Sequence, residues 1–570
     1  MKKFLSILLT LAMCAGVFAG CGSDGVIRGV SLGEVIEYAS LAERLEAYGL
    51  DENRRFIEPR SITVEVFDRE NAANGGTDPT NNAYTDWIKE GLLRDHNIIV
   101  EFVRVHRWTE ADVIVNLLAA GSAPDVCYSY NINAVNTYGR MDAIWDLNPF
   151  MHNSEELFPN IWETLGRTNI FQNQDPQTNH LWMLEGMNYG GLRLNTFVRE
   201  DWLEALGMDA PTSEAEFEAM LIAFRDNAEL LLGSDADQMV PFNLAQDVGW
   251  QAGLLIESYI PNDITDREWY ITDFHDRRMF RTGVKEAIRV LNRWYNDGLI
   301  DPDFALYGPG NDTPEDRKKA GFVGAFIHNW DYPYRGGEQG ITAELHRNVG
   351  EHANFIAVDT FLNDAGLHRK FLPTTTADRK IFLPSTNTEP VASLLYVDWI
   401  SRPEVILYLQ TGEEGLTHEI MDNGAIRIIP APAHDPMFMN SPRNIDYTIG
   451  YNGNGFINID DQRVKTLSLA LGYAEVPPRL IEAAFAAGTN DGRTTKAVNV
   501  GIIESEDGLS NTLRDRMEAL WATSIVASPE DFDSVYDAAM DNIMINIGNA
   551  SIAERTEKFA EFYGDVDWLP

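Results

Sequence analysis

From Ser61 onward, the sequence alternates between strand-like and helix-like patterns. Residues 61–67 (SITVEVF) alternate apolar and polar positions as a strand does, and residues 97–105 (NIIVEFVRV) are also predicted to form a strand. A stretch with helical spacing follows each of them, at residues 85–94 and 111–119, and the segment GSAPDVCYSY at 121–130 contains the next strand. This order is typical of an α/β fold with mainly parallel strands.

The residues just beyond the strands are the first candidates for a functional site. In α/β sheets, ligands bind in crevices beyond the carboxyl ends of the strands. Asp68 and Arg69 follow the first strand, Trp108 follows the second, and residues 128–131 follow the third. Taken one at a time, each also fits a loop residue without a role.

Helices further along the chain are predicted from their ends. Ser213 and Glu216 have the spacing of a capping box. Thr388 is predicted to cap a helix with Pro390 in its first turn. Two other helices are predicted from an apolar face and a terminal glycine: Val198, Trp202, Leu203 and Leu206 before Gly207, and Ala287, Ile288, Leu291 and Trp294 or Tyr295 before Gly298.

The N-terminus has the pattern of an export signal. Lys2 and Lys3 precede an apolar stretch at residues 4–17, which is too short for a membrane span. Residues 18–21 (FAGC) resemble a bacterial lipobox, which predicts cleavage before Cys21 and attachment of lipid to its sulfur. The alternative is an ordinary secretory signal with a chance cysteine. We expect a signal peptide at residues 1–20 and a lipidated N-terminus with a spacer at 21–58, in which Leu41, Leu45 and Tyr48 have helical spacing and indicate a weakly helical patch.

The net charge argues against a nucleic-acid-binding protein, and the cysteine content argues against a fold held by disulfides. The chain has 87 acidic and 45 basic residues, a formal net charge of −42, which would repel nucleic acid phosphates. It has three cysteines, and with Cys14 in the signal and Cys21 lipidated, only Cys127 remains. We therefore expect no disulfide, and a buried Cys127. A chain of 570 residues can bury a large core without disulfides.

Several segments resemble a known family, each weakly alone but all in the family's order. They are GSAPDV, VREDWLEALGMDAPTSEAEF, LNRWYNDGLIDPDF, GFVGAF, EPVASLLYVDWISRPEVILYLQTGEEG and MEALWATSIVASPEDFDSVYDAAMDNI. Together with the lipobox they resemble family 1 extracellular solute-binding lipoproteins of carbohydrate ABC importers, in particular the longer oligosaccharide-type branch. The resemblance covers nearly the whole chain after the signal.

This resemblance implies a two-lobe periplasmic-binding-protein fold, with both α/β lobes interleaved in residues 59–570, hinge crossings and a ligand cleft between the lobes. Aromatic rings would cover the C–H faces of a sugar, and polar side chains would bind its hydroxyls. The candidate ligand contacts are Asp68, Arg69, Tyr128, Tyr130, Trp182, Tyr189, Trp250, Trp330 and Tyr332. For each aromatic residue the alternative is core packing or a place at the rim. Trp330 is predicted to be a stacking platform.

The resemblance also raises the question of metal and of ligand charge. Relatives often carry a calcium loop at the position of LLGSDADQMVPF, where this chain keeps Asp235 and Asp237 but lacks the central glycine and closing glutamate. We therefore expect no metal and no cofactor. Three arginines could pair with uronic acids if they face the cleft: Arg69, Arg107 and Arg193. Alternatively, they lie on the surface or form ion pairs that stabilise the fold.

The expected function is capture of an oligosaccharide by a monomeric, lipid-anchored protein on the extracytoplasmic face of the membrane, and its delivery to ABC permease subunits. A protein of this kind is not an enzyme. The alternatives are a lipid-anchored glycoside hydrolase, which needs two carboxylates across the scissile bond, and a sugar-binding partner of a sensor or chemoreceptor. Peptides and other solutes also stay open as ligands.

Overall fold

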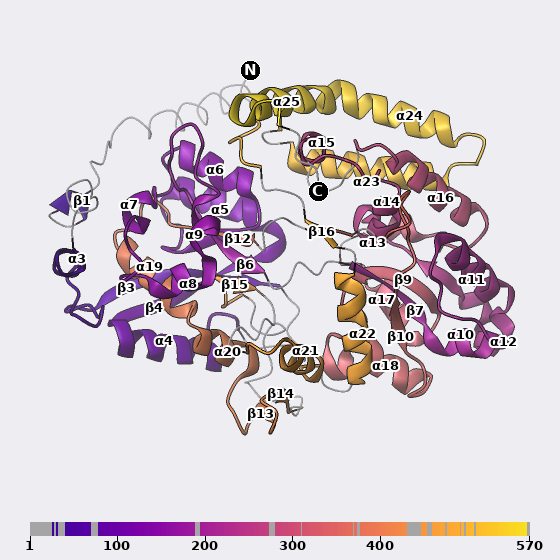
Figure 1. The fold of residues 1–570 in the computed structure, drawn as a ribbon, viewed down its shortest axis with the longest axis horizontal. Coiled ribbons are helices and arrows are strands. Elements are labelled where there is room, and N and C mark those ends of the chain that lie inside the picture. The colour runs from indigo at the N-terminus through magenta and orange to yellow at the C-terminus, as the bar shows by residue number, and fades with distance from the viewer. Residues whose placement is uncertain are drawn as a thin grey trace, which may run out of the picture.

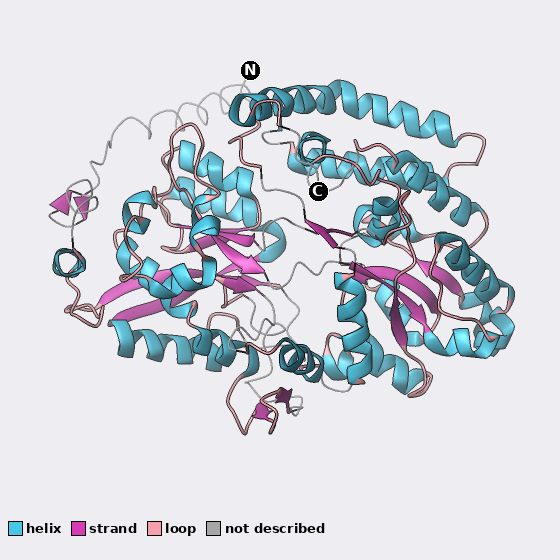
Figure 2. Cartoon of the chain, in the orientation of Figure 1, coloured by secondary structure: helices cyan, strands magenta, loops and turns pink. Residues whose placement is uncertain are grey.

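The computed structural model describes residues 26–27, 30–31, 40–69, 78–188, 194–272, 280–308, 310–368, 370–372, 377–429, 446–452, 459–473, 476–490, 492–494, 498–506 and 509–566. Figure 1 shows two lobes side by side, the first on the left and the second on the right. Each lobe has a β-sheet covered by helices, as the cartoon in Figure 2 makes clear.

The sheet of the first lobe is built around β3 (Arg60–Asp68) and β4 (Ile98–His106), which pair in parallel over their full length. A parallel bridge from Val64 to Val126 joins β3 to β5 (Cys127–Ser129). β12 (Ala377–Phe382) then runs antiparallel between β5 and β6 (Leu184–Asn188), and β15 (Tyr451–Asn452) pairs in parallel with β6.

Helices pack on both sides of this sheet. The longest is α4 (Ala83–His96), and α19 (Pro390–Ile400) is buried along its whole length. The others are α3 (Leu41–Tyr48), α5 (Glu110–Ala120), α6 (Ile132–Arg140), α7 (Asn148–Met151), α8 (Pro159–Leu165), α9 (Arg167–Phe171) and α20 (Pro403–Thr411). Their apolar faces form one core with the strands.

The sheet of the second lobe has the order β10 (Phe355–Val358), β7 (Leu194–Arg199), β9 (Val323–Asn329) and β8 (Val240–Asn243). β7 is antiparallel to both of its neighbours, and β8 is parallel to β9. Adjacent residues of β7 enter different cores, Phe197 one and Val198 the other. Side chains of a strand alternate between faces, so this lobe has a core on each side of its sheet.

The helices of the second lobe cover both faces. They include α10 (Glu200–Leu206), α11 (Glu214–Asp226), α12 (Ala228–Leu232), α13 (Val248–Gln251), α14 (Gly253–Ser258), α15 (Asp266–Thr272), α16 (Val284–Asn296), α17 (Thr313–Ala320), α18 (Ile341–Asn348), α21 (Gln462–Leu471) and α22 (Pro478–Thr489). The C-terminal helices α23 (Ser510–Val526), α24 (Phe532–Ile543) and α25 (Asn549–Tyr563) lie along the top of Figure 1.

The two lobes are interleaved in the sequence. The chain leaves the first lobe after β6, builds β7 to β10 in the second, and returns to the first with β12. Between the lobes, β11 (Lys370–Leu372) pairs in parallel with β16 (Gly492–Thr494), near the centre of Figure 1. The predicted two-lobe α/β fold is thus confirmed, but the sheets are mixed rather than mainly parallel, because β7 and β12 enter them in the opposite direction.

The folded part begins earlier than predicted. Ser40 caps α3 in a capping box with Glu43, and Leu45 and Tyr48 are buried in the first-lobe core. The backbone N–H of Phe56 donates to the carbonyl of His96 at 3.0 Å. Residues 40–58, assigned above to a spacer, are therefore part of the first lobe. Cys21 and the rest of the predicted signal lie outside the described residues.

Most of the predicted helix ends are confirmed, with two corrections. Ser213 accepts the backbone N–H of Glu216 at the start of α11, and Gly207 ends α10 with a φ of 63°. Val198, however, lies in β7. All residues of that strand are buried, so the strand lacks the alternation that would distinguish it from a helix in the sequence. Thr388 is not the cap of α19, since Glu389 stands there without a capping side-chain bond.

Two other observations bear on the sequence predictions. Cys127 is buried, and its Sγ is 3.3 Å from the carbonyl of Pro124. Among the described helices, none has the length and apolar character needed to cross a bilayer.

Candidate functional site

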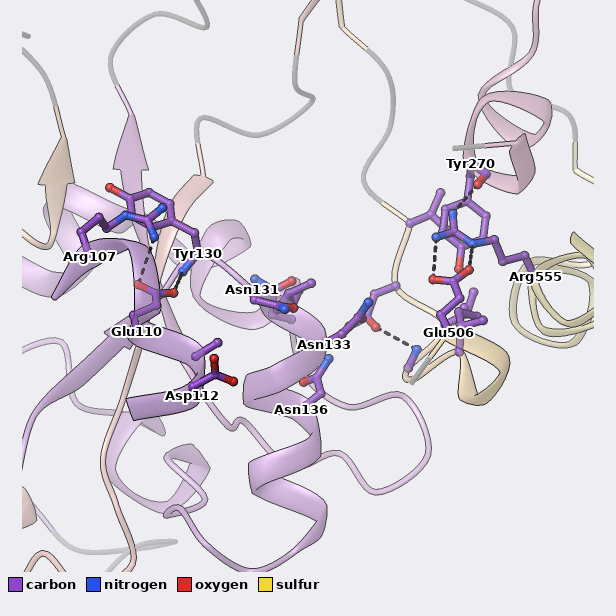
Figure 3. Close-up of a pocket in the computed structure, with 18 of the residues that line it drawn as sticks. Arg107, Glu110, Asp112, Tyr130, Asn131, Asn133, Asn136, Tyr270, Glu506 and Arg555 are labelled. Atoms are coloured by element: carbon purple, nitrogen blue, oxygen red, sulfur yellow. Dashed lines mark hydrogen bonds and ion pairs between the residues drawn. The ribbon is translucent and has the colours of Figure 1, made fainter. Parts of the chain in front are cut away.

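A cavity of about 640 Å³ lies where the first lobe meets the C-terminal part of the chain. One wall comes from the first lobe, at η2 (Arg107–Thr109), α5, the end of β5 and α6. The other wall consists of Tyr270 in α15, residues 498–506 with η9 (Glu504–Glu506), and Arg555 in α25 (Figure 3). Since α25 continues from η10 (Met544–Gly548), whose Ile547 is in the second-lobe core, both lobes contribute to the cavity.

The first-lobe wall is formed where strands end and helices begin. η2 follows the last residue of β4, and Asn131 follows β5 by two residues and caps α6, accepting the N–H of Ala134 at 3.1 Å. Asn133 and Asn136 come three residues apart on α6, so both side chains lie on the face that lines the cavity. No described residue hydrogen-bonds to either side-chain amide, which leaves both amides available to a ligand.

Tyr130 is held firmly in this wall. The guanidinium of Arg107 lies 4.3 Å from the centre of its ring. Its hydroxyl accepts hydrogen bonds from Nη2 of Arg69 at 3.2 Å and from Nε of Arg379 at 3.0 Å. Arg107 in turn lies 3.4 Å from a carboxylate oxygen of Glu110. The ring is therefore fixed before any ligand arrives.

The carboxylate of Glu110 connects three parts of the first-lobe wall: β5, the residue that follows it, and η2. Its Oε1 accepts the hydroxyl of Ser129 at 2.7 Å and the N–H of Tyr130 at 3.4 Å. Burial raises the pKa of Glu110, although the nearby Arg107 opposes that shift. Its carboxyl group is engaged in holding the wall and has little surface left for a ligand, with 5% of the residue exposed.

The opposite wall centres on an ion pair between Arg555 and Glu506. Nε and Nη2 of the arginine donate to the two carboxylate oxygens at 2.5 and 2.9 Å, and Nη1 donates to the carbonyl of Tyr270 at 2.7 Å. The guanidinium lies 5.1 Å from the centre of the Tyr270 ring. Burial raises the pKa of Tyr270, so its hydroxyl is a neutral donor and acceptor at physiological pH.

Of the predicted contact residues that the structure describes, Tyr130 lines this cavity, and so does Arg107, one of the three arginines considered for uronic acids. Arg69 supports it from behind: its guanidinium makes a bidentate ion pair with Asp446, with Nε 2.8 Å from Oδ2 and Nη2 2.9 Å from Oδ1. Asp68 is 3.3 Å from Arg104 and lies away from the cavity.

Two of the predicted aromatic contacts are core residues, which argues against direct ligand binding. Tyr128 is 0% exposed, and its hydroxyl accepts the N–H of Phe67 at 3.1 Å. Trp182 is 4% exposed and packs so tightly on Gly139 that a Cβ there would come within 2.3 Å of the ring. Both belong to the first-lobe core.

The predicted contacts of the second lobe are half-buried and do not line the cavity. Trp250 packs against one core of that lobe and Trp330 against the other. The hydroxyl of Tyr332 donates to Glu315 at 2.7 Å, and its ring stacks on His328 with 3.5 Å between ring centres. Tyr189 and Arg193 lie outside the described residues.

Several residues of the cavity were missed by the sequence analysis. They are Thr109, Asp112, Asn133, Asn136, Asn173, Tyr270, Asn499, Glu506 and Arg555. For Asn133 and Asn136 there was a usable signal, because they follow the third strand end by only a few residues. Nothing local in the sequence connects Tyr270 or Arg555 to that strand end.

The segment where relatives can carry a calcium loop forms the 3₁₀-helix η3 (Gly233–Gln238). Within the described ranges, no group of three or more His, Cys, Asp or Glu side chains could hold a metal ion. That no metal is bound stays a prediction.

Comparison with solved structures identifies the architecture. The chain superposes on the alginate-binding protein AlgQ2 without calcium ion with a TM-score of 0.62, at 14% identity and covering 89% of this chain and 99% of that chain. The chain has the two-lobe fold of solute-binding proteins. The ABC-transporter substrate-binding protein FusA of S. pneumoniae, in complex with kestose, gives a TM-score of 0.60 at 11% identity, covering 89% and 100%.

A third solved structure of a solute-binding protein has the same fold over most of its length. An extracellular solute-binding protein from Bifidobacterium longum subsp. infantis gives a TM-score of 0.56 at 14% identity, covering 88% of this chain and 98% of that chain. No protein-family model and no curated protein sequence matches the chain. The similarity is therefore one of fold, and the solute-binding fold extends over most of the chain.

Proposed function

We propose that this protein is an extracytoplasmic solute-binding protein that captures an oligosaccharide and delivers it to the permease of an ABC transporter. The observation that carries the proposal is the cavity between the two lobes, where the side-chain amides of Asn133 and Asn136 have no partner among the described residues and the rings of Tyr130 and Tyr270 stand on opposite walls. Sugars present hydroxyl groups and flat C–H faces, which suit these groups. The two-lobe fold gives such a cavity a means of closing around its ligand.

The solved neighbours support an oligosaccharide ligand. One is named for alginate, and another is a complex of an ABC-transporter substrate-binding protein with kestose. A partner permease, and a monomeric state in solution, are part of the same proposal.

We propose binding without turnover. Glycoside hydrolysis needs one carboxyl group as the acid and a second as base or nucleophile. Three acids line this cavity, and two of them, Glu110 and Glu506, are engaged with arginine side chains at 3.4 Å and 2.5 Å. Asp112 is then the one described acid of the lining without such a partner, and a single carboxyl group does not supply the pair that hydrolysis needs, so the bound sugar should be released unchanged.

A thermal-shift screen against a panel of oligosaccharides tests this proposal. A ligand at one hundred times its Kd should stabilise the protein by about 2.7 kcal/mol. Asn136→Ala should weaken the response to that ligand about tenfold, because a hydrogen bond to the sugar is lost. Asn546→Ala, at an exposed asparagine that does not line the cavity, is the control. A panel without any stabilising sugar, or an Asn136→Ala variant that binds as the wild type does, would overturn the proposal.

The membrane anchor is a separate part of the proposal. The short apolar segment followed by Cys21 supports attachment of lipid to this residue. Two or more acyl chains hold a protein on a bilayer stably, where a single chain is marginal. The Cys21→Ser variant should leave the membrane fraction and appear in the soluble one, as followed by cell fractionation. If the variant stays wholly with the membrane, the lipobox interpretation is wrong.

A further inference from the structure

Most, but not all, of the charged side chains that line the cavity have an ion-pair partner among the described residues. Its described cations are Arg107 and Arg555, and its acids are Glu110, Asp112 and Glu506. The guanidinium of Arg555 donates two hydrogen bonds to the carboxylate of Glu506 and one to the carbonyl of Tyr270. Arg107 is paired with Glu110 at 3.4 Å, and its guanidinium lies 4.3 Å from the centre of the Tyr130 ring. Neither arginine is left free to receive a carboxylate from a ligand.

Asp112 differs from the other two acids. It stands in the first turn of α5, its side chain is exposed, and it lines the cavity. No hydrogen bond or ion pair to another described residue involves its carboxylate, and no dashed contact reaches it in Figure 3. Two arginines against three acids leave the described lining with one uncompensated negative charge, which is carried by Asp112.

Arg69 does not alter this balance. Its guanidinium lies next to Tyr130 but makes a bidentate ion pair with the buried carboxylate of Asp446. A ligand carboxylate would have to displace Asp446, whose side chain is only 3% exposed. Breaking a buried ion pair by removing one partner is costly.

We infer that the ligand is an oligosaccharide without carboxylate groups, and that Asp112 is the residue that determines this specificity. The inference rests on the proposed function and narrows its substrate class. The carboxylate of Asp112 accepts a hydrogen bond from a hydroxyl of a neutral sugar, or pairs with the ammonium of an amino sugar. Toward a uronic acid it presents a like charge at close range, and among the described lining residues no arginine is left to offset it.

A second role for Asp112 has to be separated from this one. An acidic residue in the first turn of a helix also stabilises that helix through its dipole. That contribution would appear in the unfolding of the empty protein, and it would affect every ligand equally. Only the specificity role changes the ratio of affinities between charged and neutral sugars.

The test uses pairs of oligosaccharides that differ only in charge. Each pair is an oligouronate and its carboxyl-reduced counterpart, of the same length and linkage, and several linkages are titrated by calorimetry. The wild type should bind the reduced member about tenfold or more tightly than the acidic one. Asp112→Asn keeps the side-chain shape and removes the charge, so this ratio should fall about tenfold. Glu101→Gln, exposed on β4, makes the same change of net charge elsewhere and should leave the ratio unchanged.

The outcomes separate this inference from the proposed function. If the wild type binds an oligouronate as tightly as its reduced partner, or if Asp112→Asn leaves the ratio unaltered, the inference is wrong while oligosaccharide binding stands. If Glu101→Gln lowers the ratio as much as Asp112→Asn does, overall charge rather than Asp112 is responsible, and the inference again fails. If neither member of any pair binds and no other sugar of the panel does, the proposed function fails, and the inference with it.

Discussion

At the scale of single residues, Tyr130 shows how a binding surface is prepared before a ligand arrives. Its hydroxyl accepts from two arginines, and a third arginine covers one face of its ring. All of these partners are brought from distant parts of the sequence to the end of β5. Little side-chain entropy then remains to be lost on binding, which favours affinity.

Trp330 illustrates the opposite case, an aromatic side chain that resembles a ligand platform in sequence but packs in the structure. Its ring meets Tyr473 at 6.3 Å and Phe485 at 6.0 Å, both edge to face. Such pairs contribute about 0.5–1.5 kcal/mol beyond the area they bury. The ring is half-buried against a core of the second lobe and takes no part in the cavity.

We therefore predict that Trp330→Ala lowers the stability of the empty protein by about 1–3 kcal/mol, since the ring is only half-buried. The affinity of the folded fraction for its sugar should not change. Thermal unfolding without ligand and calorimetric titration with ligand measure the two quantities. Trp330→Phe, which keeps an aromatic edge for Tyr473, should lose less stability. A tenfold or greater loss of affinity with normal stability would instead restore Trp330 as a stacking platform.

The sequence allowed the first-lobe side of the site to be predicted in outline. The rule that ligands bind beyond strand ends led to residues 128–131, and Tyr130 and Asn131 do line the cavity. The rule could not separate Tyr130 from Tyr128, because which of two alternating side chains is buried depends on the partners of the strand. Arg69 was identified by position, but its ion pair with Asp446, 377 residues away, has no local signal.

At the scale of elements, strands and helices with strong local patterns were predicted well. β3 spans Arg60–Asp68 where residues 61–67 were expected, and α16 buries Ala287, Ile288, Leu291 and Trp294 as expected. The failures have a common cause. β7 is buried on both faces and lacks alternation. The helical spacing of α3 was recognised, but its place in the first-lobe core depends on tertiary contacts that have no local signal.

The contacts of α3 lead to a prediction about the N-terminal part of the first lobe. Leu45 is 9% exposed and packs in the first-lobe core, and Nη1 of the adjacent Arg44 donates to the carbonyl of His152 at 2.9 Å. Leu45→Ala should reduce the free energy of unfolding by about 2–4 kcal/mol, slightly below the range for a fully buried leucine. Chemical denaturation measures this change. Glu46→Ala, on the exposed side of the same helix, is the control and should change it by less than about 0.5 kcal/mol. Equal effects of both substitutions would show that α3 does not contribute to the core.

At the scale of the whole molecule, the interleaved path of the chain explains why the second wall of the cavity could not be predicted. Each lobe is assembled from segments far apart in sequence, and the cavity joins residues 107–136 to Tyr270, residues 498–506 and Arg555. Such pairings depend on how two folded lobes meet, which no local pattern encodes. The order of the family-like segments was enough for the fold but not for this wall.

The account makes one central claim, that an oligosaccharide binds in this cavity and leaves it unchanged. Isothermal titration of the mature chain, with the sugar that stabilises it most in the screen, tests this most directly when the sugar is recovered and its mass measured. We predict saturable binding of one sugar per chain, with the recovered sugar at its original mass. Binding should weaken about tenfold or more in Tyr270→Ala, which removes a ring from the second wall. A shortened sugar, or an affinity that is the same in Tyr270→Ala, would contradict the account.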